Sequence, residues 1–169
     1  TSGLIVSKLQ MLQTTPIPAL AMQGNILTGL TLRRYEAFEE CPSFAQLTTP
    51  PHYTELKKWG IHLLFKQALG GSVILGDSHE YAPASAVDDL GFDVKTYINE
   101  LILAEAERIV TFPVRAVASS WAGYYAQHPD ELYEYQLSPA IRIVTGIGGK
   151  GMTSSLGLAQ ENLQKWGVI

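Results

Sequence analysis

The chain contains a single cysteine, Cys41, and no apolar run long enough to cross a membrane as a helix. One thiol can form neither an internal disulfide nor a thiolate metal cluster, and a reducing compartment suits it best. No signal peptide precedes the first apolar segment, which begins at Leu4. These shortages predict a cytoplasmic protein with no membrane span, no disulfide and no bound metal.

Positive charge is also scarce, because 12 Lys and Arg residues are set against 16 Asp and Glu residues, for a formal net charge of −4. A surface that tracks phosphates needs a basic excess, so we expect no nucleic-acid partner. The pairs Arg33-Arg34 and Lys57-Lys58 are interpreted as solvated in the first instance. With 169 residues, the chain suits one domain or one lobe of a larger protein.

Glycine, in contrast, is concentrated in one segment. Residues 145–153 read Thr-Gly-Ile-Gly-Gly-Lys-Gly-Met-Thr, between a β-branched run and a helical pattern. Glycine lets main-chain N–H groups approach a ligand without an intervening Cβ, and a helix N-terminus favours negative charge there. The predicted anion or cofactor loop comprises Gly146, Gly148, Gly149, Lys150, Gly151, Met152 and Thr153.

Two common glycine motifs do not describe this loop. A Walker loop places a hydroxyl residue after its lysine, whereas Gly151 and Met152 follow Lys150. The spacing of Gly146, Gly148 and Gly151 fits a dinucleotide fingerprint, but the acidic residue and the continuing βαβ unit that the fingerprint needs are missing. A nucleotide site made by this loop alone is therefore disfavoured, and a glycine-rich turn without a ligand remains open.

The remaining pattern is dominated by strands linked by turns, which predicts an α+β fold with an antiparallel or mixed sheet and helices on one face. The clearest helix is expected at residues 94–110, with Asp93 as its N-cap. A hairpin is expected across Gly70-Gly71. Strands are expected at residues 4–12, 28–38, 61–66, 72–75, 115–125, 133–137 and 142–145, with short helical turns at 43–47 and 53–59 and a helix after the glycine loop.

Five segments in this order resemble the C-terminal half of FAD-dependent oxidoreductases of the D-amino-acid oxidase and glycine oxidase superfamily, closest to a subgroup proposed to act in aminophosphonate catabolism. They read Lys-Leu-Gln-Met-Leu (8–12), Leu-Thr-Leu-Arg-Arg-Tyr (30–35), Gly-Asp-Ser-His-Glu-Tyr (76–81), Trp-Ala-Gly-Tyr-Tyr (121–125) and the glycine loop. The resemblance implies a substrate-binding domain at residues 1–140 and a strand, loop and helix at 141–169 that would complete an FAD domain. It also implies that an N-terminal Rossmann FAD-binding part is absent from these residues.

The resemblance assigns the glycine loop to the FAD, whose reduced ring carries negative charge that loop amides would stabilise. Lys150 has two open roles, a charge near flavin or substrate or a solvent-facing side chain. His79 matches a position close to the substrate, where its ordinary pKa of about 6.5 would allow anion binding or proton exchange, while a structural histidine remains open. His62 is interpreted as a packed core histidine. Tyr125 is the second catalytic candidate by the same resemblance.

The chain departs from the family at the segment after Gly123, where amino-acid oxidases carry an arginine that clamps the substrate carboxylate. Plain amino-acid oxidation therefore loses its usual anchor, and an aminophosphonate becomes compatible. On the expected strand, Arg33 and Arg34 point to opposite faces, so at most one should reach a site, and ordinary surface arginines remain open. The implied substrate-binding set is Arg33, Arg34, His79, Tyr125 and Lys150.

The sequence therefore favours the substrate-binding and C-terminal part of an FAD-dependent amine oxidoreductase, inactive without its Rossmann part. Its partners would be a small-molecule amine substrate and that FAD-binding part. The alternative is a non-catalytic binding or assembly module that pairs with a separate FAD-binding chain.

Overall fold

The computed structural model describes residues 2–169 and shows an α+β protein with an antiparallel sheet, as the sequence predicts. The chain forms two compact units. The core unit comprises Lys8–Glu80 and Gly91–Gly123, and the terminal unit comprises the described residues up to Ser7, Tyr81–Leu90 and Tyr124–Ile169. Each unit is described by itself below.

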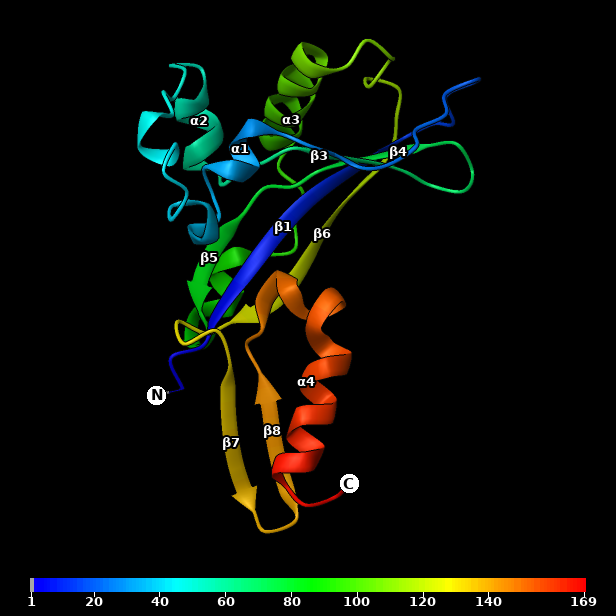
Figure 1. The fold of residues 1–169 in the computed structure, drawn as a ribbon. Coiled ribbons are helices and arrows are strands. Elements are labelled where there is room, and N and C mark those ends of the chain that lie inside the picture. Colours follow the sequence, from blue (N-terminus) through cyan, green and yellow to red (C-terminus); the bar gives the residue numbers. More distant parts are fainter. Residues whose placement is uncertain (1) are drawn as a thin grey trace. The chain divides into compact units, whose positions relative to one another are not determined.

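The main sheet has six strands in the order β2-β3-β4-β1-β5, and β6 also pairs with β1. Its strands are β1 (Ile5–Thr14), β2 (Ile26–Leu27), β3 (Leu64–Gln67), β4 (Val73–Gly76), β5 (Glu80–Pro83) and β6 (Val117–Gln127). The core unit adds the helices α1 (Gly29–Leu32), α2 (Tyr53–Lys58) and α3 (Thr96–Ile109), with the 3₁₀ turns η1 (Glu36–Phe38) and η2 (Phe44–Gln46). Figure 1 shows α2 and α3 on the same side of β3 and β4.

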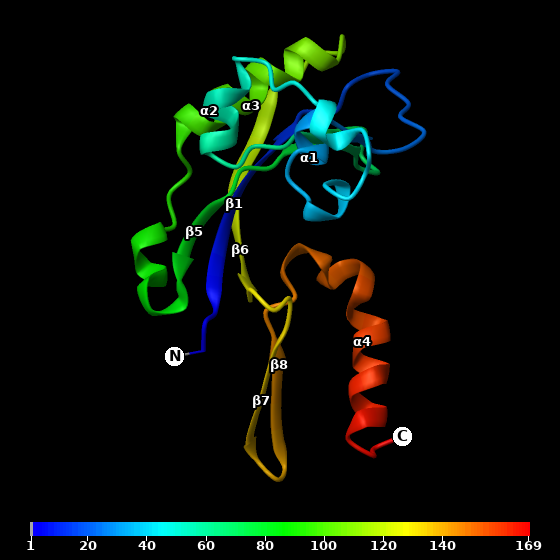
Figure 2. The same cartoon turned by 60° about the vertical axis from the view of Figure 1, so that its left-hand side comes forward.

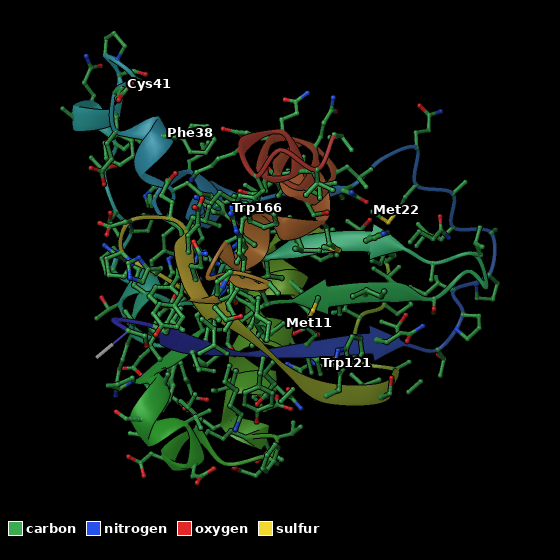
Figure 3. The ribbon with its side chains drawn as sticks, turned by 90° about the horizontal axis from the view of Figure 1, so that it is seen from below. Met11, Met22, Phe38, Cys41, Trp121 and Trp166 are labelled. Carbon is green, nitrogen blue, oxygen red and sulfur yellow. The ribbon has the colours of Figure 1, made fainter. Side chains whose placement is uncertain are left out.

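The core lies between these strands and helices. Leu12 of β1 pairs with Leu75 of β4, which in turn pairs with Phe65 of β3, so one apolar row crosses three strands. All three side chains are buried, and Ile98 and Ile102 of α3 pack in the same cluster. Each fully buried side chain of this size contributes about 1.5–3 kcal/mol by leaving water. Met11, the neighbour of Leu12 on β1, points to the other face and lies against Gly76 (Figure 3).

The start of α3 is fixed from β1. The buried Gln10 side chain accepts a hydrogen bond from Lys95 N–H (2.8 Å) and donates to Lys95 O (2.8 Å) and to Asn99 Oδ1. Because the helix begins at Thr96 with Lys95 as N-cap, the expected cap at Asp93 is wrong. The Asp93 carboxylate instead lies 3.5 Å from Nζ of Lys8, a lysine whose side chain is fully buried.

The terminal unit contains a hairpin and the last helix. Strands β7 (Tyr133–Ser138) and β8 (Ile141–Thr145) pair antiparallel, and the glycine loop leads through the 3₁₀ turn η4 (Gly148–Lys150) into α4 (Gly151–Lys165). A further 3₁₀ segment, η3, spans Ala84–Leu90. Figure 2 shows α4 running beside the hairpin, where Lys165 pairs with Glu134 (2.6 Å) and Arg142 stacks over Trp166.

The predicted strand at residues 28–38 is wrong. The structure places only β2 before it, then α1 and η1. Its apolar residues served as a strand pattern, but Leu30 and Thr31 are buried on one turn of helix and Arg33 donates back to Gly29 O (2.8 Å). Four residues of helix are too few for periodicity to reveal.

The other expected elements are confirmed: the first strand, the hairpin across Gly70-Gly71, the short helical turns, the long helix and the strands and helix that end the chain. None of the helices in the described part of the chain is long and apolar enough to cross a membrane.

Candidate functional site

Three buried polar residues meet where β3 and β4 come together in the core unit. His62 lies just before β3 and Asp77 just after β4, and each donates its backbone N–H to the carbonyl of the other (3.1 and 3.2 Å). His79 follows two residues later, with its N–H donated to Trp59 O (2.8 Å). The hairpin register therefore brings these three side chains together, and we call them the His–Asp–His cluster.

The side chains of the cluster are close but poorly satisfied. Asp77 Oδ1 lies 3.0 Å from His62 Nε2, and Asp77 Oδ2 lies 3.8 Å from His79 Nε2. The 3.0 Å contact does not have the angles of a hydrogen bond. Both ring nitrogens of His62 and the Asp77 Oδ1 atom therefore lack a hydrogen-bond partner within the described chain. Buried polar atoms without hydrogen-bond partners are rare in native proteins. Those of the cluster therefore indicate that a proton, a water molecule or a ligand binds there.

Burial sets the ionisation of the cluster. Burial, and next the nearby charge of Arg34, lower the pKa of His62 to about 4. The same two causes lead for His79, whose pKa falls to about 3. Burial raises the pKa of Asp77 to about 7, although Arg34 opposes the shift. At neutral pH the imidazoles are therefore uncharged and the carboxyl is poised to exchange a proton.

The ring of His79 has a defined orientation. Its Nδ1 lies 3.1 Å from Gly60 O, and because a carbonyl only accepts, Nδ1 carries the proton in this contact. In the neutral ring Nε2 is then an acceptor, on the side of Asp77. Gly60 approaches closely because it has no side chain, since a Cβ there would lie 2.8 Å from His79 Cβ.

The cluster has the donor types of a metal site. One ligand atom from each of His62, Asp77 and His79 lies within 4.8 Å of the other two. Zinc and iron bind imidazole and carboxylate donors. However, the two imidazole rings are stacked at 18° with centroids 5.2 Å apart, so their in-plane lone pairs run nearly parallel. One ring would have to turn before both nitrogens could bind a shared ion.

A hollow of about 150 Å³ borders the cluster through Gly60 and Arg34. It is lined by Leu30, Arg33, Arg34, Lys57, Gly60 and Ile61. Arg33 and Arg34 both line it because they follow the short helix α1, so they do not have the opposite-face arrangement that was expected for a strand. From the sequence, Lys57 is interpreted as one of a solvated pair, and neither Asp77 nor Gly60 stands out as a site residue. Position Asp77 could have been found from the hairpin, since it pairs with His62.

The glycine loop lies in the terminal unit, where Gly146 is buried, Gly148 and Gly151 are half-buried and Gly149 is exposed. Gly146 (φ +83°) and Gly148 (φ +65°) adopt backbone angles that favour glycine, and a Cβ would lie 2.9 Å from His128 and 3.2 Å from Gln127, respectively. The turn therefore requires these two glycines. A Cβ on Gly149 would meet only the Tyr125 ring and hydroxyl, at 3.6 Å or more. The local fold leaves Gly149 without a reason to be glycine, which is the condition for a backbone that a ligand approaches.

The remaining predicted residues of the loop are at the surface. Met152 is 98% exposed at the start of α4, and Thr153 is exposed beside it. Lys150 forms an ion pair with Glu131 (3.0 Å) while both remain solvent-accessible. The Tyr125 hydroxyl accepts a hydrogen bond from Gln127 Nε2 (3.3 Å). Tyr125 and Lys150 thus belong to the terminal unit, whereas Arg33, Arg34 and His79 gather in the core unit.

No protein-family model matches the chain, and no curated protein sequence matches it. The resemblance to flavin-dependent oxidoreductases therefore depends on the sequence segments alone. The geometry of the glycine loop and of the His–Asp–His cluster supplies separate grounds for a function.

Proposed function

We propose that this chain is the substrate-binding and C-terminal part of an FAD-dependent amine oxidoreductase. The observation that carries the proposal is Gly149, an exposed glycine just before the start of α4 that the local fold does not require. No side chain caps this helix start, although the N–H of Gly151, its first residue, is donated to Gly148 O of the preceding turn. The resemblance of five ordered sequence segments supports the same assignment.

The loop suits the pyrimidine end of a flavin. Its backbone N–H groups, at the N-terminus of the 15-residue helix α4, would stabilise negative charge on that end of the ring. When bound, the flavin supplies the acceptor for a hydride from the carbon that carries the amine. In this proposal Gly146 and Gly148 shape the turn, the N–H of Gly151 is held by Gly148 O, and Gly149, Lys150, Met152 and Thr153 would face the flavin.

The His–Asp–His cluster suits the amine. An alkylammonium group must lose a proton before a hydride can leave its carbon, and Asp77 is a carboxylate that can take that proton and become a neutral acid. His79 is neutral and would hold the amine nitrogen through Nε2, while Nδ1 stays bonded to Gly60. Tyr125 stays a catalytic candidate by resemblance. The protein's part is to position and deprotonate the substrate.

The test uses the protein expressed from the coding sequence of this chain joined to the coding sequence that precedes it. We expect that product to be yellow, with flavin absorbance near about 450 nm. Gly149→Ala should lower the flavin content, because the new methyl group would cover the amides while its nearest protein atoms, those of Tyr125, stay 3.6 Å or more away. Gly157→Ala is the matched control. Gly157 lies inside α4, no atom lies within 4 Å of the new Cβ, and this variant should keep its flavin. Equal flavin content in the two variants, or a colourless parent that binds no added FAD, would contradict the proposal.

The second candidate is a non-catalytic module that pairs with a separate FAD-binding chain. It is favoured by the exposure of apolar side chains on α4, where Met152 is 98% and Leu156 86% exposed. Intact mass spectrometry of material from the native source discriminates the two, because one long polypeptide with FAD supports the first and two separate chains support the second.

A further inference from the structure

We propose that the hollow lined by Arg33, Arg34 and Lys57 is a binding site for a tetrahedral oxyanion. The proposed function is needed only to say which molecule carries the anion, namely the substrate at its end opposite the amine. Binding itself depends on the core unit alone. Three observations carry the inference: the charge around the hollow, the way Arg33 is held, and the size of the hollow.

The charge around the hollow is of one sign. Of the six residues that line it, three are cationic and none is acidic. Lys57 forms no salt bridge within the described part of the chain, in contrast to Lys58, which lies 3.7 Å from Glu55. The charge of Arg34 also acts beyond the hollow, since it helps to lower the pKa of both His62 and His79. An anion is the complement of this field.

Arg33 is held in place before any ligand arrives. Its guanidinium donates to Gly29 O (2.8 Å) and to Thr48 O (2.5 Å) and lies over the Tyr53 ring, with 5.6 Å to the centroid. A fixed guanidinium loses little rotamer freedom on binding, which improves affinity. The buried side chains of Leu30 and Ile61 supply the apolar part of the lining.

The size suits a small anion. One water needs about 10–15 Å³ of such volume, so a hollow of about 150 Å³ has room for an oxyanion with a short tail. Gly60 lines the hollow and also bonds to His79, so a tail would be directed toward the His–Asp–His cluster. A tetrahedral oxyanion is favoured over a carboxylate because it offers separate oxygens to three cations that approach from different residues.

The experiment is a calorimetric titration of the chain with inorganic phosphate, and with acetate, at constant ionic strength. We expect saturable phosphate binding, weaker by roughly tenfold in Lys57→Met and changed by less than about twofold in Lys58→Met, with acetate weaker than phosphate. Lys57 is chosen because its side chain is exposed, so the variant folds. The neighbouring Lys58 has the same charge but does not line the hollow.

Three outcomes would overturn the site: no saturable binding in the millimolar range, equal weakening in both lysine variants, or acetate binding as tightly as phosphate. The flavin experiment above gives an independent result, because it reads the loop in the terminal unit. A protein that binds phosphate through Lys57 but never binds FAD would keep this site and lose the proposed function.

Discussion

The carboxyl group of Asp77 lies 3.0 Å from the imidazole of His62 without forming a hydrogen bond to it. The backbones of the two residues are joined by a reciprocal pair of N–H···O bonds, which keeps the two residues side by side. A carboxyl group is thus kept among uncharged imidazoles, where its ionisation is costly. The protonation of one residue is therefore coupled to the stability of the sheet.

The first prediction concerns the pH dependence of Asp77→Asn. Below the ordinary carboxyl pKa of 3.8 the group is protonated in both folded and unfolded chains and contributes nothing. Between pH 3.8 and about 7 the unfolded chain ionises while the folded chain holds its proton, so Asp77 lowers stability as the pH rises. The difference in unfolding free energy, Asn variant minus parent, should grow across this window by on the order of 4 kcal/mol and stay constant above it.

The measurement is the unfolding of both proteins by denaturant at several pH values between about pH 4 and pH 8. Asp88→Asn, which changes an exposed acid, is the control. The lowered pKa values of His62 and His79 act in the opposite sense. As the pH falls below the ordinary value of 6.5, the unfolded chain binds protons that the buried imidazoles do not, so the folded state loses stability. A difference that is flat with pH would show that Asp77 ionises normally.

The second prediction concerns Gly60→Ala. Gly60 has φ +58°, and the added Cβ would lie 2.8 Å from His79 Cβ and 3.0 Å from His79 O. Left-handed backbone alone costs a non-glycine residue about 1–2 kcal/mol, and the contact adds to it, so we expect a loss of at least about 2 kcal/mol. Gly24→Ala, whose Cβ meets nothing within 4 Å, should stay within about 0.5 kcal/mol of the parent. Thermal unfolding of the two variants decides the point, and similar melting temperatures would refute it.

The third prediction concerns Gln10→Ala. The substitution removes three partly buried hydrogen bonds to Lys95 and Asn99 and leaves the Lys95 N–H and carbonyl without this partner, for a cost of about 2–4 kcal/mol. Amide hydrogen exchange should accelerate in the first turn of α3. Gln13→Ala on the same strand removes one side-chain bond, to Ser72, and should leave α3 exchange unchanged. Faster exchange along the whole of α3 in both variants would mean that Gln10 has no specific capping role.

Long and strongly patterned elements were predictable from sequence. The long helix α3, the hairpin of β3 and β4, and the strand-loop-helix order from β8 to α4 were all expected, because period and turn residues specify them. The boundary of α3 was not, because its first N–H group is capped by Gln10, 85 residues earlier in the chain. A side chain that caps from another strand leaves no local signal.

The candidate site was predictable only in part. His79 and the arginine pair were singled out, but Arg33 and Arg34 were assigned to a strand, so their joint approach to one hollow was missed. Lys57 looked like half of an ordinary surface pair, because only the tertiary fold distinguishes it from Lys58. The pKa of His79 was expected at its ordinary value, since burial and the neighbourhood of Arg34 are not written in the sequence.

The sealed ammonium group of Lys8 gives the protein a built-in reporter. Its side chain is fully buried, whereas Lys57, Lys58, Lys150 and Lys165 are open to solvent. An amine-specific acylating reagent will therefore label the other positions while the chain stays folded and will reach this one only when β1 leaves the sheet. Peptide mapping of that single modification would give the fraction of molecules in which the central strand has opened.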